Sequence, residues 1–146
     1  MPSQQLIVED PVLIGEIAAT ARRVVVVGIK PESLEDQPAH YVPKYLHDHG
    51  VEIIPVPVYY PDVKEIFGLP VLRSLDEVGP PVDVVCLFRR SEDIGEHVDD
   101  LIDLAPQTVW MQAGIRNDAA ARRLAEAGIQ VVQDACMMVE HRRATN

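Results

Sequence analysis

The chain has 146 residues, of which 47% are hydrophobic and 25% are charged. This is the size and balance of one globular domain, so we predict a single domain over residues 1–146. The 23 acidic and 13 basic residues give a formal net charge of −10, which disfavours binding to the phosphates of nucleic acid.

The first two predicted elements are a short helix and a valine-rich strand. Asp10 followed by Pro11 favours a helix start, because Asp is a good N-cap and Pro fits the first turn, so we predict a helix over about residues 10–21. Four successive valines then predict a strand over residues 23–28 that is buried on both faces, as in a parallel sheet covered by helices. Gly28 ends this strand, because glycine permits a tight turn and the close approach of a ligand.

The rest of the chain alternates predicted strands and helices. Ser91 and Asn117 are expected to cap the helices that follow them, and Gly50 and Gly128 to end the helices that precede them. The predicted elements are, in chain order, an exposed loop (29–37), a helix (39–49), a strand (51–55), a short edge strand (68–72), a helical turn (74–78), a strand (82–88), a helix (92–104), a strand (108–112), a helix (118–127), a strand (129–132) and a helical tail (135–143).

This alternation predicts a Rossmann-like, doubly wound α/β fold: a mostly parallel sheet of about five strands with helices on both faces. The strand order 3-2-1-4-5 follows if residues 71–72 take the outer position. The winding then reverses between the strands at 24–27 and 84–88. Ligands of such sheets bind outside the carboxyl ends of the strands at this reversal, so we expect the loops there to build the site.

Several segments of the chain occur in an order and spacing that carry a family resemblance. They are residues 24–28, 38–46, 54–56, 67–68, 82–85 with 88–89, 109–115 and 136–141. Together they resemble a family of small stand-alone coenzyme A (CoA)-binding proteins, similar to the CoA-binding domain of the succinyl-CoA synthetase alpha subunit. The resemblance implies a Rossmann-type fold that binds CoA with no ligase half attached. The chain departs from the family in a longer, more acidic loop at 29–37 and at residues 57–61, where the family usually has Asn-Pro after Pro-Val.

Bound CoA would present a diphosphate to the expected site. The helix opening at Pro38 offers the backbone N–H groups of Ala39, His40 and Tyr41, with Gly28 and Ile29 as the floor. The alternative for Gly28 is that it only ends a strand. Positive charge would come from Lys30, Arg89 and Arg90. The alternative is that one of the two arginines pairs with Glu92 or Asp93.

The adenine and the pantetheine arm of CoA need apolar contacts and hydrogen bonds. Pro55, Val56, Phe88 and Ile115 are the candidate apolar contacts, and each would equally serve as packing at the end of the sheet. Gln112 and Gly114 follow a strand and are placed to meet the amides of the arm. Trp110 is expected in the core, and Lys44 on the surface.

Cys136 and His141 raise the possibility of a nucleophile with its base, because a thiolate needs a neighbouring base or cation to react at neutral pH. No third orienting group is evident, so packing is the favoured interpretation. A mixed disulfide between Cys136 and the CoA thiol would need only exposure and reach. The histidines lack H-x-x-x-H and H-E-x-x-H spacing, so we predict no metal site. No catalytic constellation is evident in the sequence, so we also predict no catalytic residue.

We therefore expect a protein that binds CoA or an acyl-CoA through its diphosphate and pantetheine arm, without evident catalysis, with a homodimer as a possible assembly. A cytoplasmic location is expected for three reasons. Residues 1–5 lack a secretory signal, and no apolar run approaches the roughly 20 residues that span a bilayer. Cys86 lies in an apolar strand-like run, which disfavours a structural disulfide. The alternatives are an NAD(P)-linked or thiol/acyl-CoA exchange enzyme using Cys136, and a ligand-sensing interaction domain. Glu52 lies inside a strand rather than at its end, which argues against NAD.

Overall fold

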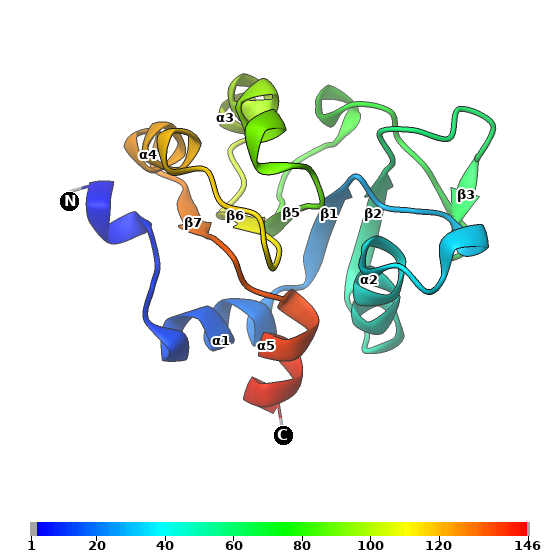
Figure 1. Cartoon of the computed structure of the whole chain (residues 1–146), viewed down its shortest axis with the longest axis horizontal. Coiled ribbons are helices and arrows are strands. Elements are labelled where there is room, and N and C mark those ends of the chain that lie inside the picture. The colour runs from blue at the N-terminus through cyan, green and yellow to red at the C-terminus, as the bar shows by residue number, and fades with distance from the viewer. Residues whose placement is uncertain (1–2, 146) are drawn as a thin grey trace.

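Five parallel strands in the order β2-β1-β5-β6-β7 form the central sheet of the computed structural model, which describes residues 3–145 (Figure 1). Residues 1, 2 and 146 of the predicted domain lie outside the described part. The strands are β1 (Arg23–Val27), β2 (Glu52–Val56), β5 (Val84–Leu87), β6 (Thr108–Met111) and β7 (Gln130–Val132). The predicted Rossmann-like α/β fold is confirmed.

Helices cover both faces of this sheet (Figure 1). Residues of α1, α2 and α5 pack on one face, and residues of α3 and α4 pack on the other. The α-helices are α1 (Pro11–Thr20), α2 (Pro38–Asp48), α3 (Val98–Leu104), α4 (Asp118–Glu126) and α5 (Met137–Thr145). Short 3₁₀ helices occupy Ser3–Leu6, Glu32–Leu34, Leu75–Glu77 and Ser91–His97. No helix within residues 3–145 has both the length and the apolar character that crossing a bilayer requires.

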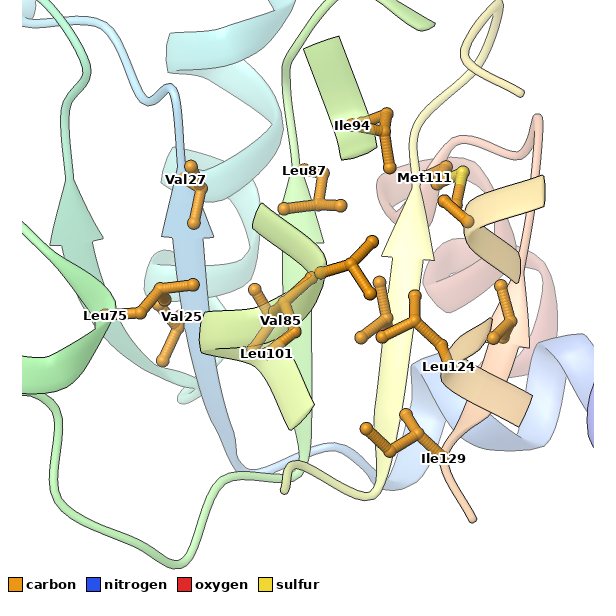
Figure 2. Close-up of a cluster of buried hydrophobic side chains, with 14 of the residues drawn as sticks. Val25, Val27, Leu75, Val85, Leu87, Ile94, Leu101, Met111, Leu124 and Ile129 are labelled. Carbon is orange, nitrogen blue, oxygen red and sulfur yellow. The ribbon is translucent and has the colours of Figure 1, made fainter. Parts of the chain in front are cut away.

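The valine run of β1 supplies both cores at once. Val25 and Val27 face the cluster under α3 and α4, whereas Val24 and Val26 face the cluster under α1, α2 and α5. Figure 2 shows Val25 and Val27 among the first of these clusters. Each of the four is at most 2% exposed. Burying a valine contributes about 1.5–3 kcal/mol, which explains why an uninterrupted apolar strand belongs in the middle of a covered sheet.

Local capping signals act as predicted at several helix ends. The Asp10 carboxylate accepts a hydrogen bond from the Val12 N–H at 3.0 Å, and the Asn117 side-chain oxygen accepts one from the Ala120 N–H at 3.0 Å. Gly50 follows α2 with φ +87°, a conformation that glycine adopts without steric cost.

The predicted edge strand at residues 68–72 is wrong. The chain instead forms a separate antiparallel hairpin, β3 (Glu65–Ile66) and β4 (Leu69–Pro70), so β2 is the edge strand of the sheet in the described part of the chain. Phe67 and Gly68 both have positive φ, which is the geometry of a tight two-residue turn that folds the segment onto itself. Beyond it, the Leu72 N–H donates one hydrogen bond to the Pro55 carbonyl at the edge of β2.

The predicted helix over 92–104 is also only partly correct. Its first half is the 3₁₀ helix Ser91–His97, and regular α-helix begins with α3 at Val98. Ser91 does not cap it. Its hydroxyl oxygen accepts a hydrogen bond from the Arg116 N–H at 3.0 Å, and its carbonyl accepts one from the Asn117 side-chain amide at 2.9 Å. Ser91 therefore ties together the loops that follow β5 and β6.

The reversal of winding lies where it was predicted. Strand β1 pairs with β2 on one side and with β5 on the other, so successive crossovers leave β1 in opposite directions. The loops after β1 and β5 consequently diverge over opposite faces of the sheet and leave a crevice between them.

Candidate functional site

A cleft of about 590 Å³ opens at the carboxyl edge of the sheet, where the loops after β1, β5 and β6 meet the first turns of α2 and α5. Its lining residues are Lys30, Pro38, Ala39, Tyr41, Val42, Phe88, Arg89, Arg90, Gln112, Ala113, Ile115, Cys136, Met138 and Val139. The cleft therefore brings together segments that are more than a hundred residues apart in the sequence.

Many of the predicted site residues meet in this cleft, and the others do not line it. Those in the lining are Lys30, Pro38, Ala39, Tyr41, Phe88, Arg89, Arg90, Gln112 and Ile115. Gly28, Ile29, His40, Pro55, Val56 and Gly114 are outside the lining.

The predicted binding residues do not include Val42, Ala113, Met138 and Val139, and Cys136 is considered in the sequence analysis only as a possible nucleophile or disulfide partner. A signal for part of this set existed, because residues 136–141 carry the family resemblance and follow the last strand at the same edge.

Gly28 allows the backbone turn after β1 at the reversal of strand order. Its N–H donates to the Val56 carbonyl at 2.9 Å, and its φ is +84°. A Cβ at this position would lie 2.2 Å from the carbonyl oxygen of Phe88, so only glycine lets the turn after β1 approach the end of β5 this closely. The next residue, Ile29, is fully buried, and its N–H has no acceptor within residues 3–145.

The first turn of α2 offers fewer free N–H groups than predicted. The Gln37 carbonyl accepts hydrogen bonds from the His40 N–H at 2.9 Å and the Tyr41 N–H at 3.0 Å. Because these two donors are engaged, the prediction that they bind a diphosphate is corrected. The Ala39 N–H has no acceptor in the described part of the chain.

His40 is a structural residue. It is 2% exposed, and its Nδ1 lies 2.9 Å from the Lys30 carbonyl, which requires the proton on Nδ1. The Lys30 N–H donates in turn to the Ala39 carbonyl at 3.0 Å. These bonds fix the backbone of the loop after β1 against the start of α2 and position the Lys30 side chain in the cleft.

The two arginines after β5 are held by acidic side chains. The Arg90 Nε donates to Asp93 at 2.8 Å, and this bond raises the pKa of Arg90. The Arg89 side chain is 11% exposed and lies 3.5 Å from the Glu96 carboxylate and 3.9 Å from that of Asp93. The structure thus favours the ion-pair alternative for both arginines. Lys30 has no carboxylate within ion-pair distance among residues 3–145.

His97 forms a hydrogen bond with Arg89 beside the cleft. Its Nε2 accepts a hydrogen bond from the Arg89 Nε at 3.2 Å. Burial and the neighbouring Arg89 guanidinium lower the pKa of His97, so the ring favours the neutral form that can accept this bond.

Gln112 lies at the floor of the cleft and is 3% exposed. Its Oε1 accepts hydrogen bonds from the Met137 N–H at 3.0 Å and from the Cys86 thiol at 3.4 Å. Its Nε2 has no acceptor within residues 3–145. The side chain therefore anchors the start of α5 through its oxygen.

The acidic loop at residues 29–37 does not fill the cleft. The Glu32 carboxylate accepts a hydrogen bond from the Phe67 N–H at 2.7 Å, which draws the loop toward the β3–β4 hairpin. Residues 32–36 are absent from the cleft lining. The negative charge of this loop is therefore kept away from the space where an anionic ligand would lie.

His141 packs against Tyr45 and is not placed to activate Cys136. Its Nδ1 lies 2.9 Å from the Tyr45 hydroxyl, and it is 7% exposed between α2 and α5. Burial and the nearby His49 lower the pKa of His141. No hydrogen bond joins His141 to Cys136 within the described residues. In the same part of the chain, no group of three or more His, Cys, Asp and Glu side chains is arranged to hold a metal ion.

Comparison with known proteins places these features in a family. The model of the CoA binding domain family matches residues 22–142. The uncharacterized protein YneT of Bacillus subtilis (strain 168) is 35% identical over 128 residues, which are 88% of this chain and 91% of that protein.

Solved structures agree with this match. A protein from Thermus thermophilus, described as cell-free ID.343, is 35% identical with a TM-score of 0.82, covering 93% of this chain and 99% of the other. A hypothetical protein from Pyrococcus horikoshii OT3 is 30% identical with a TM-score of 0.82, covering 94% of each chain. The chain belongs to the CoA-binding domain family.

Proposed function

We propose that the protein binds CoA or an acyl-CoA in the cleft at the carboxyl edge of the sheet and does not transform it catalytically. The observation that carries the proposal is the cleft itself. It lies at the reversal of strand order and, among residues 3–145, joins the free N–H of Ala39, a lysine without a carboxylate partner and an apolar wall, in a chain of the CoA-binding domain family.

The diphosphate would lie against the loop after β1 and the first turn of α2. Within residues 3–145 the Ala39 N–H has no protein acceptor, and the Lys30 side chain lines the cleft without a carboxylate partner. Backbone N–H groups at a helix N-terminus and a lysine ammonium are the donors that phosphate oxygens prefer. This arrangement supplies local positive potential in a chain whose net charge is −10.

The remainder of the cleft suits the pantetheine arm. Phe88, Ile115, Met138 and Val139 contribute apolar surface, and the Gln112 Nε2 offers a donor to an amide carbonyl. An alternating series of methylene groups and amides needs this combination of apolar contact and sparse hydrogen bonds.

A nicotinamide dinucleotide fits the same edge less well. NAD recognition uses a carboxylate at the end of the second strand to bind the ribose hydroxyls. Glu52 lies instead at the start of β2, where it pairs with Arg23 at 3.2 Å, and Val56, Pro57 and Val58 stand at the other end.

Isothermal titration calorimetry with CoA, acetyl-CoA and NAD tests the proposal. We expect a micromolar Kd for the two CoA compounds and weaker binding of NAD. Lys30→Glu should weaken CoA binding by roughly 10- to 100-fold, because a charge-assisted hydrogen bond contributes about 1.5–3 kcal/mol. Lys44→Glu is the matched control, since Lys44 pairs with Asp48 at 2.8 Å outside the cleft lining. The absence of heat with both CoA compounds would overturn the proposal.

A further inference from the structure

Cys136 is the cysteine that a ligand in the cleft can reach. It lines the cleft and is partly exposed, whereas Cys86 is 1% exposed inside the sheet. Burial also raises the pKa of the Cys86 thiol far above its usual range, which leaves that thiol protonated. The Cys136 carbonyl accepts the Glu140 N–H at 3.0 Å, so Cys136 stands at the N-terminus of the nine-residue helix α5, where negative charge is favourable.

Gln112 provides an independent sign of where a ligand's arm lies. It is 3% exposed, and its Nε2 has no acceptor within residues 3–145 even though the residue lines the cleft. No buried side-chain nitrogen or oxygen among residues 3–145 lacks a hydrogen-bond partner, so the Gln112 Nε2 reaches the open space of the cleft, where it can donate to a ligand oxygen. Its Oε1 binds the Met137 N–H at 3.0 Å, which puts Gln112 against the residue next to Cys136.

The chemistry of pantetheine connects these two residues. Its last amide carbonyl is separated from the thiol by only an N–H and a short ethylene link. A carbonyl bonded to the Gln112 Nε2 would consequently bring the sulfur of the ligand close to the start of α5. An arm that accepts this hydrogen bond therefore ends near the Cys136 thiol.

We propose that Cys136 captures CoA covalently by exchange with a CoA disulfide, an inference that rests on the proposed function. The Cys136 thiolate attacks the pantetheine sulfur held in the cleft, and the bond between that sulfur and its disulfide partner breaks. The partner leaves as a thiolate and takes up the proton that Cys136 lost. The disulfide is the oxidant, one new disulfide replaces one old one, and a free small thiol reverses the step. Each protein molecule captures one CoA. The redox state of CoA therefore controls the fraction of protein molecules whose cleft is occupied.

Intact-protein mass spectrometry after incubation with CoA disulfide tests this inference. We expect one adduct with the mass of CoA less two hydrogens, which dithiothreitol removes. Trypsin separates the cysteines into peptides 74–89 and 124–142, so the adduct should appear on the second peptide. Cys136→Ser should lose the adduct, and Cys86→Ala, the matched control, should keep it. Adduct formation should be at least about tenfold faster with CoA disulfide than with oxidised glutathione, because binding raises the effective concentration of the disulfide.

The outcomes separate the two proposals. Calorimetric heat with reduced CoA but no adduct, or an adduct on peptide 74–89, would overturn the covalent capture and leave CoA binding intact. Equal rates with CoA disulfide and oxidised glutathione would also overturn it, because the thiol would then merely be exposed. If calorimetry detects no heat from reduced CoA, the proposed function itself is overturned. Peptide mapping uses the unaltered protein, so its result does not depend on whether a variant folds.

Discussion

Replacing Gly28 with alanine should destabilise the protein by about 2–5 kcal/mol. A left-handed conformation costs a residue with a side chain about 1–2 kcal/mol, and Gly28 has φ +84°. The new Cβ would also lie 2.2 Å from the Phe88 carbonyl oxygen, and forcing such a contact to relax costs about 1–3 kcal/mol. Relaxation is hindered, because the Gly28 N–H bonds to Val56 and the Phe88 N–H bonds to Val27, both at 2.9 Å.

Gly50→Ala is the matched control for this prediction. Gly50 has nearly the same φ, +87°, but a Cβ there would meet nothing within 4 Å. The free energy of unfolding of Gly50→Ala should therefore fall only by the cost of the left-handed conformation, about 1–2 kcal/mol. Urea unfolding followed by circular dichroism measures both variants. If the two substitutions reduce the free energy of unfolding equally, the close approach of Gly28 to Phe88 contributes nothing and the reasoning fails.

Three further predictions address other parts of the chain. Asp83→Ala should reduce the free energy of unfolding by about 1–3 kcal/mol, because its carboxylate accepts two backbone N–H bonds at 2.8 and 2.9 Å at the start of β1, while calorimetry should find CoA affinity unchanged at the opposite edge. Gln112→Leu should cost about 1–3 kcal/mol in urea unfolding by leaving the Met137 N–H without its acceptor; undiminished stability would contradict that hydrogen bond. The lowered pKa of His141 means that the unfolded chain binds its proton first as pH falls below the ordinary 6.5, so stability decreases by up to about 1.4 kcal/mol per pH unit. The variant His141→Gln should flatten this part of a stability profile measured between about pH 5 and 8, and parallel profiles would refute the assignment.

The sheet could be predicted from the sequence because its signals are local. Four consecutive valines disfavour a strand with one solvent-exposed face. The side chains of Asp10 and Asn117 accept hydrogen bonds from backbone N–H groups within three residues of themselves. Each of these preferences is decided by neighbours in the chain, and the fold agrees with all of them. The position of the cleft followed from the same pattern, since the reversal of winding depends only on the order of the strands.

The hairpin β3–β4 could not be predicted in this way. Its turn depends on a positive φ at Phe67, a residue type that gives no local signal for that conformation. Residues that are distant in the sequence stabilise this conformation. The Phe67 N–H donates to Glu32, and the His40 and His47 rings pack on the Phe67 ring. Such long-range contacts decide the outcome where local preference is weak.

The candidate site was partly predictable for a related reason. A strand end, a glycine or a helix start can be read locally, but whether a polar group remains free depends on all its neighbours. The sequence showed Arg89 and Arg90 at the mouth of the cleft, and the structure shows that acids of the next turn hold both. Lys30 has no carboxylate partner among residues 3–145, and Glu32, an acid of the same loop, is bound instead by the Phe67 N–H. Affinity for an anion in so acidic a chain therefore depends less on the number of cations than on which of them the fold leaves without a partner.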